Sequence, residues 1–308
     1  MTGRRSTASG AIYTGLQSGE SSTYNWVELT SPSRDTFLAI ATPVFGEACV
    51  AIGKPLVGGE VEFVGTGTMI ALGVCVTATH VLDALGQDQP VLYAFLPYGR
   101  ARVWALTRSD HFRAIHRHPV TPENDRLEKH DLSLLACELI SEPVAEEPIG
   151  LLPVAMAIPA VGDRLTAYGY SVPKGEAPQM FVTSGLVTNV YPDRRDPMLP
   201  NPCVEVDMTT RAGMSGGPVI NAHGRVVGVL STSVGNHEQG RPTFVSLVWQ
   251  ADLLSVGRSW PESKWSWRAD AIGTLKAARQ DGLADIKGHA GEHPIDGRWY
   301  VETPLDLT

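Results

Sequence analysis

The sequence predicts an all-β protein built from two similar halves. The chain of 308 residues is long enough for two domains, since one domain usually takes roughly 100–200 residues. Charged residues make up only 19% of the chain, which also contains 31 glycines and 22 prolines. This composition suits short strands joined by turns better than a helical bundle. Short apolar runs bounded by turn residues recur through most of the chain, which is typical of a β-barrel or a β-sandwich.

The expected elements follow in two sets. The first set lies in a predicted N-terminal β half, residues 37–146, with strands at 37–41, 48–52, 67–72, 74–78, 91–95, 103–106 and 132–138. The second set lies in a predicted C-terminal β half with a helix, residues 147–258. Its expected strands are 164–170, 179–190, 203–208, 217–220, 226–231 and 243–248, followed by a helical pattern at 249–256. The proline-rich loop 191–202 is expected to be exposed.

Both ends of the chain differ from the two halves. Residues 1–36 are rich in Ser, Thr and Gly and weakly patterned, so we interpret them as a partly ordered leader segment. Residues 259–308 form a C-terminal extension. One amphipathic helix is expected there, because Trp265, Ala269, Ile272 and Leu275 recur at intervals of three or four residues.

Charge and hydropathy exclude several kinds of partner. The net charge is −8 and no basic block is present, which argues against nucleic acid because phosphate binding needs a Lys/Arg face. The first residues contain no apolar run of the kind that a secretory signal needs. The longest uncharged stretch, residues 63–82, contains three glycines and four threonines and therefore predicts two strands and a turn rather than a membrane span. No membrane partner is expected.

The four cysteines, Cys49, Cys75, Cys137 and Cys203, are widely spaced. They form no CxxC pair and have no histidine at metal-ligand spacing. We expect free thiols in a reducing compartment and a cytoplasmic location. No metal site and no cofactor are predicted, and the histidines around His116 are interpreted as part of a solvated loop.

The most unusual segment is Arg211-Ala212-Gly213-Met214-Ser215-Gly216-Gly217-Pro218. A serine among glycines lies on a tight turn, since glycine allows positive φ and close approach of other atoms. Such a turn can direct two backbone N–H groups at one point, as an oxyanion hole requires. An ordinary glycine-rich hairpin turn remains an equal alternative for this segment alone.

Two further segments carry a histidine and an aspartate. His80 follows the apolar run Val76-Thr77-Ala78-Thr79, and Asp131 begins a run of alternating leucines. Taken singly, His80 is more often a structural residue and Asp131 more often a turn or cap residue. Taken with Ser215 they supply a nucleophile, a base and a carboxylate that orients the base. The order His, Asp, Ser is one of the known triad orders, and it divides the site between the two halves.

At these residues the chain resembles the chymotrypsin-fold, trypsin-like serine peptidases, most of all their bacterial branch. The resemblance covers roughly residues 37–257. It is carried by Gly65-Thr66-Gly67, Val76-Thr77-Ala78-Thr79-His80-Val81, Asp131-Leu132-Ser133-Leu134-Leu135, Gly213-Met214-Ser215-Gly216-Gly217-Pro218, Gly228-Val229-Leu230-Ser231 and 243–254. It implies two antiparallel β-barrels of chymotrypsin type with the active site in the crevice between them, plus a C-terminal helix and extension.

The resemblance also implies roles for individual residues. Ser215 would be the nucleophile, His80 the general base and then acid, and Asp131 the residue that orients His80. The N–H groups of Gly213 and Ser215 would form the oxyanion hole. Ser231 stands where the family often has a residue that hydrogen-bonds the buried Asp. The reaction implied is peptide-bond hydrolysis through an acyl-enzyme.

Three departures from the family are visible in the sequence. Met214 stands where the digestive and clotting enzymes carry an Asp that pairs with a newly freed N-terminus, so activation by that route is not expected. No Cys comes directly after His80 or directly flanks the segment around Ser215, so the disulfides of the secreted animal enzymes are missing. Thr79 replaces the usual Ala before the histidine, a change that we expect to be tolerated.

The expected substrate-binding residues are small, polar and uncharged. They are Thr209, Thr210, Ser231, Thr232 and Ser233, with Thr209 at the position where trypsin itself carries an Asp. We therefore expect no strong preference for Arg or Lys before the cut. The threonine at position 210 resembles the matching residue of relatives that prefer Glu or Gln. Those relatives usually have a His where this chain has Leu230.

Three functions remain open from the sequence. The first is a serine endopeptidase acting on a protein or peptide substrate, with a specific target protein or a regulatory protein partner. The second is a catalytically silent trypsin-like scaffold or binding protein, although such proteins usually lack a triad residue and none is lost here. The third is an esterase that uses the same triad.

Overall fold

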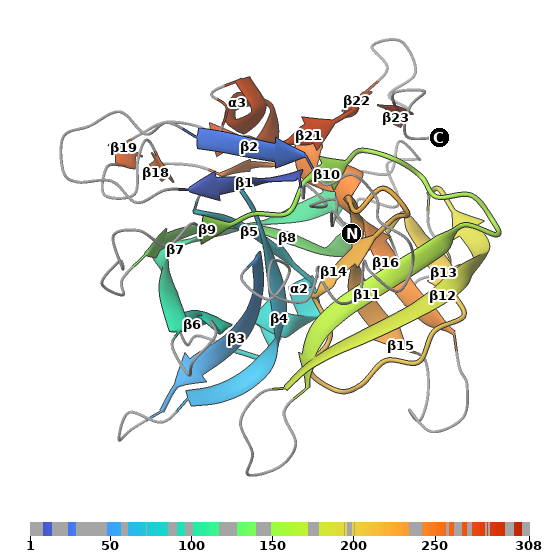
Figure 1. Cartoon of the computed structure of the whole chain (residues 1–308), viewed down its shortest axis with the longest axis horizontal. Helices are drawn as coiled ribbons and strands as arrows, with labels where there is room; N and C mark the ends of the chain where they lie inside the picture. Colours follow the sequence, from blue (N-terminus) through green and yellow to red (C-terminus); the bar gives the residue numbers. More distant parts are fainter. Residues whose placement is uncertain are drawn as a thin grey trace, which may run out of the picture.

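The computed structural model of the chain describes residues 9–13, 24–28, 48–56, 61–71, 73–85, 91–95, 101–116, 128–139, 149–171, 179–193, 195, 199, 201–233, 242–256, 259–261, 267–269, 273–280, 282, 284–292 and 299–303. These residues form mainly strands, arranged as two barrels that stand side by side in Figure 1. The predicted domain ends at residues 36, 146 and 258 lie outside the described residues, as does the expected strand 37–41.

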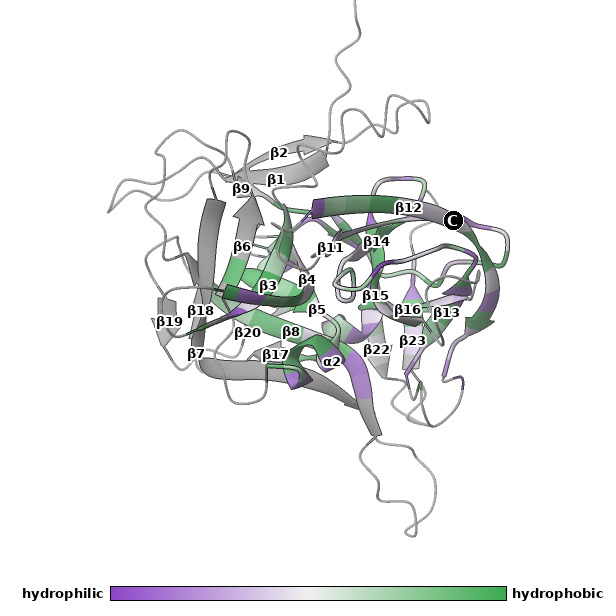
Figure 2. Ribbon diagram, turned by 90° about the horizontal axis from the view of Figure 1, so that it is seen from below, coloured by the Kyte–Doolittle hydropathy of each residue, from purple (hydrophilic) through white to green (hydrophobic). Residues whose placement is uncertain are grey.

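The first barrel consists of six antiparallel strands in the closed order β3-β4-β5-β8-β7-β6. Their bounds are β3 Cys49–Pro55, β4 Val61–Ala71, β5 Val74–Thr77, β6 Val91–Phe95, β7 Ala101–His116 and β8 Glu128–Leu139. Gly73, at φ +67°, makes the tight turn between β4 and β5, a conformation that favours glycine. The barrel interior is filled by apolar side chains such as Ile52, Met69, Leu92 and Leu135. Figure 2 shows the hydrophobic colour on β5 and β8.

The second barrel also closes on itself, because β14 pairs with both β11 and β15. Its strands are β11 Arg164–Ser171, β12 Gln179–Tyr191, β13 Cys203–Val206, β14 Pro218–Ile220, β15 Val226–Ser233 and β16 Thr243–Leu247. All neighbours within this ring are antiparallel. The predicted all-β fold with two barrels of chymotrypsin type is confirmed.

A connecting segment joins the barrels through β9, Ile149–Gly150, and β10, Val154–Ala155. The leader segment is not without structure: β1, Ser9–Tyr13, pairs with β2, Tyr24–Glu28, and with β9. The strand β10 runs parallel to β15 and to β21, Ile286–Lys287, of the C-terminal extension. Both ends of the chain therefore pair with the segment between the barrels.

The end of the chain departs from the predicted helices. The pattern at 249–256 forms the 3-10 helix η2, Val248–Leu253, followed by β17, Ser255–Val256. The amphipathic helix expected from Trp265 onward is wrong in its first part, because Trp267–Ala269 is strand β19 and pairs with β18, Ser259–Pro261. The helix α3 is confined to Leu275–Gln280. The remaining strands are β20 Gly273–Thr274, β22 His289–Glu292 and β23 Trp299–Glu302.

The C-terminal extension shares a hydrophobic core with the barrels. Leu275 and Ala278 of α3 are fully buried, and Ala284 and Ile286 are nearly so, in the same cluster as residues of both barrels. A buried ion pair joins Asp285 to Arg225 at 2.9 Å, with side-chain exposures of 16% and 8%. The extension is therefore packed into the molecule, against residues of both barrels.

All four cysteines are free thiols, as the sequence predicts, and all four are buried. Burial raises the pKa of the Cys75 thiol to about 12, so this group stays protonated at neutral pH. In the part of the chain that the structure describes, no helix combines the length and apolar character needed to cross a membrane.

Candidate active site

His80 lies on the short helix α2, Thr79–Asp83, which follows β5 after a single extended residue, Ala78. The next two residues, Val81 and Leu82, are buried and anchor the helix on the first barrel. The His80 side chain faces outward and is 45% exposed. The apolar strand and the buried face of α2 thus present the imidazole at the edge of the barrel core.

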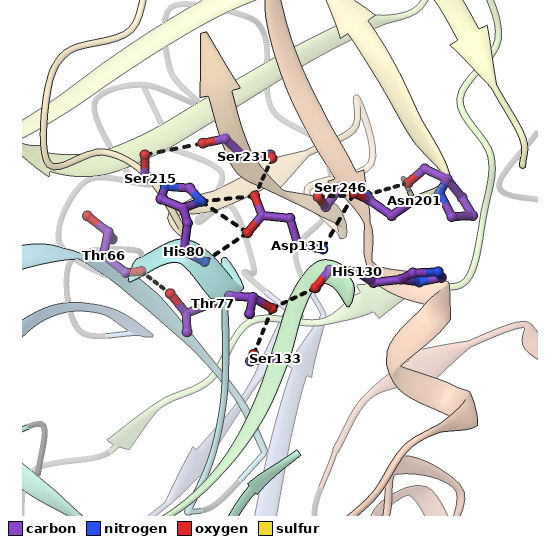
Figure 3. Close-up of polar contacts among 12 residues, drawn as sticks. Thr66, Thr77, His80, His130, Asp131, Ser133, Asn201, Ser215, Ser231 and Ser246 are labelled. Atoms are coloured by element: carbon purple, nitrogen blue, oxygen red, sulfur yellow. Dashed lines mark hydrogen bonds and ion pairs between the residues drawn. The ribbon is translucent and has the colours of Figure 1, made fainter. Parts of the chain in front are cut away.

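Asp131 on β8 holds the imidazole from one side (Figure 3). Its carboxylate lies 3.0 Å from His80 Nδ1 through both oxygens, and Oδ1 also accepts the backbone N–H of His80 at 3.0 Å. The carboxylate is only 17% exposed. Because Nδ1 faces Asp131, the proton of a neutral His80 is held on Nδ1, and Nε2 is left as a base.

The two groups shift each other's pKa in opposite directions. Burial alone would lower the pKa of His80, but the hydrogen bond and negative charge of Asp131, with a smaller contribution from Asp83, outweigh it and raise that pKa. Burial alone would raise the pKa of Asp131. Hydrogen bonds from His80 and Ser231 and the attraction of the imidazole lower it instead. The pair therefore favours a charged carboxylate and a more basic imidazole.

Ser231 on β15 connects this pair to Ser215. Its hydroxyl donates a short hydrogen bond to Oδ2 of Asp131, and its carbonyl oxygen accepts the hydroxyl of Ser215 at 3.2 Å. Figure 3 shows the resulting group of His80, Asp131, Ser231 and Ser215. His80 and Asp131 come from the first barrel and the two serines from the second. The structure thus brings together the three side chains that the sequence singles out.

Ser215 lies on a tight turn, residues 211–217, which we name the serine turn. Two of its glycines have positive φ, Gly213 at +90° and Gly216 at +82°. A Cβ atom at Gly216 would lie 2.1 Å from both the carbonyl oxygen of Thr66 and the hydroxyl of Thr77, which leaves no room for a side chain. Glycine is therefore required there both for conformation and for space.

Hydrogen bonds between backbone N–H and carbonyl groups hold the serine turn together. Met214 N–H donates to Arg211 O, and Gly217 N–H donates to Met214 O. Across the described residues, neither Gly213 N–H nor Ser215 N–H donates a hydrogen bond to another protein group. These are the two N–H groups that the sequence predicts for an oxyanion hole, and both remain available to a ligand.

Met214, which stands where the digestive and clotting enzymes carry a charged Asp, is packed in the apolar core. Its side chain is 1% exposed, and its sulfur accepts the N–H of Arg211 at 3.3 Å. Its backbone lies so close to Gly169 that a Cβ atom there would stand 2.8 Å from Met214 Cα. The serine turn is thus anchored on β11 by a buried methionine.

Several supporting residues give no signal in the sequence. Asn201 accepts the backbone N–H of Asp131 at 3.4 Å and donates to the hydroxyl of Ser246 at 2.9 Å. The buried ring of His130, next to Asp131, makes a short hydrogen bond with Gln250 of η2. These contacts join residues 45 or more positions apart, and no local pattern predicts them. The loop 191–202 is exposed as predicted at residues 192, 193 and 195, but the prediction is wrong at Leu199 and Asn201, which are buried.

Thr79 is another such residue. The sequence presents it only as a tolerated replacement for alanine. In the structure its hydroxyl donates to the carbonyl oxygen of His130 at 2.8 Å and lies 2.9 Å from the hydroxyl of Ser133. It thus links α2 to β8 on both sides of Asp131, which explains how a buried hydroxyl is accommodated beside His80.

The predicted substrate-binding residues lie on two segments. Thr209 is exposed and Thr210 half-buried, both just before the serine turn. Ser231, Thr232 and Ser233 lie on β15, where the side chains of Thr232 and Ser233 fall outside the described part. Ser231 is 3% exposed and contacts Asp131 and Ser215. The roles of these five residues in substrate binding stay predictions.

Comparison with known proteins gives one family match. The family model of the trypsin-like peptidase domain matches residues 65–229, just over half of the chain and a span that includes His80, Asp131 and Ser215. No curated protein sequence gives a significant match.

Solved structures show a more distant likeness. The active form of the Rv3671c protease from Mycobacterium tuberculosis is 19% identical, with 72% of this chain and 85% of that chain covered and a TM-score of 0.47. The crystal structure of Deg5 is 17% identical, with 70% and 91% covered and a TM-score of 0.45. The fold assignment rests on the strand pairings rather than on these two structures. By the family match, this chain belongs to the trypsin-like peptidase domain family.

Proposed function

We propose that this chain is a serine endopeptidase that hydrolyses peptide bonds in a specific protein partner through an acyl-enzyme intermediate. One observation carries the proposal: a buried carboxylate, an imidazole of raised pKa and a serine form one hydrogen-bonded group beside two unused backbone N–H groups. These are the parts that acyl transfer requires, in the family in which that chemistry occurs.

The proposed reaction begins with attack by Ser215 Oγ on the carbonyl carbon of the substrate. The proton of the hydroxyl passes to Nε2 of His80, and Asp131 stabilises the imidazolium that forms. The hydroxyl, which donates to Ser231 O in the free protein, turns toward Nε2 for this step, since catalytic hydrogen bonds often tighten only when substrate binds. The N–H groups of Gly213 and Ser215 stabilise the oxyanion of the tetrahedral intermediate.

Collapse of this intermediate breaks the C–N bond, and His80 gives its proton to the leaving amine. Water then attacks the acyl-enzyme ester, with His80 as base. The second collapse returns the proton to Ser215 and releases the acid. No step requires a metal or a cofactor.

The decisive experiment is labelling of the purified chain with a fluorophosphonate probe. The wild type should label and cleave, and Ser215→Ala should do neither, with kcat lowered by about 10⁶-fold. Ser184→Ala, which removes an exposed serine hydroxyl from β12, is the matched control and should keep both properties. Labelling that survives Ser215→Ala would contradict the proposed nucleophile.

The same assays separate the alternative functions. A silent scaffold would neither label nor cleave, and an esterase would hydrolyse small esters but no peptide. The target-specific part of the proposal predicts that the purified chain leaves most unfolded proteins intact. Indiscriminate digestion without an activator would contradict it.

We further propose that the enzyme does not prefer Arg or Lys before the cut. Thr209 and Thr210 carry no charge, and the next residue, Arg211, is exposed with its guanidinium 3.8 Å from the ring centre of Phe181. A fixed positive charge beside this segment disfavours a basic substrate side chain. Profiling against a peptide library checks this, and a dominant Arg or Lys preference would contradict it.

A further inference from the structure

Thr66, on β4 of the first barrel, is fully buried against the serine turn of the second barrel. We infer that Thr66 is a positioning residue that holds the serine turn in the shape needed to stabilise the oxyanion. This inference rests on the proposed serine peptidase function and assigns one part of it to a residue that never touches the substrate.

Three hydrogen bonds connect Thr66 to the second barrel. Its backbone N–H donates to Ser215 O at 2.8 Å, and its hydroxyl donates to Gly213 O at 2.7 Å. The same hydroxyl accepts the N–H of Tyr170, on β11, at 2.9 Å. Because Tyr170 N–H can only donate, the single proton of the Thr66 hydroxyl is directed at Gly213 O. The direction of all three hydrogen bonds is therefore defined.

Two peptide units of the serine turn are thereby fixed at both ends. In the unit between Gly213 and Met214, the N–H donates to Arg211 O and the carbonyl accepts the Thr66 hydroxyl. In the unit between Ser215 and Gly216, the N–H donates to Leu230 O at 2.6 Å and the carbonyl accepts the Thr66 N–H. Thr66 donates the hydrogen bond to the carbonyl end of each unit.

These fixed units alternate with the two that carry the proposed oxyanion donors, Gly213 N–H and Ser215 N–H. A peptide unit held at both ends cannot rotate without breaking a hydrogen bond, so its neighbours keep their orientation. Glycine at 213 otherwise permits many backbone conformations, because it populates positive and negative φ with similar ease. Thr66 thus restricts Gly213, one of the three glycines of the serine turn.

The same strand offers a matched control. Thr68 lies two residues further along β4 and is also fully buried, but its hydroxyl has no hydrogen-bond partner among the described residues. Replacing Thr with Val keeps the shape and removes only the hydroxyl. At position 66 this removes two hydrogen bonds, the one from Tyr170 N–H and the one to Gly213 O, whereas at position 68 it removes none.

The experiment compares Thr66→Val, Thr66→Ser and Thr68→Val in the full chain. We expect kcat of Thr66→Val to fall about 10²-fold, the smaller effect known for loss of an oxyanion donor, with KM changed less than about threefold. Thr66→Ser, which keeps the hydroxyl, should restore kcat to within about tenfold of the wild type. Thr68→Val should match the wild type. Affinity for a peptide boronic acid, which mimics the tetrahedral intermediate, should fall in parallel with kcat/KM in Thr66→Val.

The outcomes distinguish this inference from the proposed function. A wild-type chain that neither labels nor cleaves overturns the proposed function, and the inference with it. A wild-type kcat in Thr66→Val, equal losses in Thr66→Val and Thr68→Val, or a change confined to KM overturns the inference alone. If Thr66→Val does not fold, Thr66→Cys replaces it, because a thiol is a weak donor of similar size. An intermediate kcat is then expected, and a wild-type kcat overturns the inference.

Discussion

At the scale of single residues, the site depends on one buried carboxylate. Asp131 makes hydrogen bonds with the backbone N–H and the ring of His80 and with the hydroxyl of Ser231. Each of these contacts favours the charged carboxylate, and together they overcome the cost of its burial. The negative charge that results is what makes His80 a stronger base than a free imidazole.

This electrostatic pairing predicts the acid limb of the pH profile. His80 accepts the serine proton only when it is neutral, so activity is lost as pH falls through its pKa. Because that pKa is raised above 6.5, kcat/KM should reach half its maximum at a pH above 6.5. Measuring kcat/KM from about pH 5 to 9 tests this, and a midpoint below 6.5 would contradict it.

The variant Asp131→Asn supplies the matching control. It keeps the size of the side chain but removes the charge, so the pKa of His80 should move down and kcat should fall by about 10⁴-fold. A variant that kept the wild-type midpoint would show that Asp131 is not the cause of the shift.

At the scale of an element, the serine turn requires glycine at position 216, because the neighbouring atoms leave no space for a side chain. Gly216 combines φ +82° with two oxygen atoms, of Thr66 and Thr77, at the place where a Cβ atom would stand. Both oxygens belong to the first barrel, so the turn is shaped by the contact between barrels as much as by its own sequence.

We therefore expect Gly216→Ala to lower the free energy of unfolding by about 3 kcal/mol or more, from unfavourable φ and overpacking combined. Gly162→Ala is a useful control, since Gly162 also has positive φ, at +94°, but no atom lies within 4 Å of a built Cβ. It should lose only about 1–2 kcal/mol. Urea unfolding measures both, and equal losses would show that crowding at Gly216 contributes nothing.

At the scale of the whole molecule, the C-terminal extension is part of the folded unit. The strand β21 extends the sheet of the second barrel through β10, and the hydroxyl of Thr303 donates to Met156 O at 2.9 Å. The ion pair between Arg225 and Asp285 fastens the extension to the turn between β14 and β15. The extension is thus held by a buried charge as well as by apolar packing.

Removing one partner of this pair should be costly, because it leaves the other charge buried. We expect Asp285→Ala to lower the free energy of unfolding by about 3 kcal/mol, and Lys287→Ala, an exposed change on β21, to alter it by less than about 0.5 kcal/mol. The midpoints of urea unfolding compare them. An Asp285→Ala protein as stable as the wild type would mean that the extension adds nothing through this contact.

The sequence predicts best what local chemistry determines. The segments around His80, Asp131 and Ser215 are recognisable because their turns and apolar neighbours are contiguous, and most strands follow from apolar runs between turn residues. The tail is different: the spacing of Trp265, Ala269, Ile272 and Leu275 predicts one helix, but Trp267–Ala269 pairs with Ser259–Pro261 and is a strand. Tertiary contacts override local preference in such short segments.

The residues that support the site cannot be predicted from the sequence, because their roles also depend on tertiary contacts. Asn201 and Gln250 act on Asp131 and His130 from the other barrel, and nothing in their own neighbourhoods distinguishes them from ordinary polar residues. In the sequence, Thr66 stands out only as part of a glycine motif. Its two contacts with the serine turn depend on how the barrels dock, which no periodicity records.

The division of the site between the barrels has a mechanical consequence. His80 and Asp131 move with one barrel, Ser215 and Ser231 with the other, and Thr66 reaches across to the serine turn. A small rotation of one barrel against the other would lengthen the hydrogen bonds that cross between them, from Ser231 to Asp131 and from Thr66 to Gly213, while each barrel kept its own closed ring of strands. Turnover would then depend on the relative orientation of the two barrels.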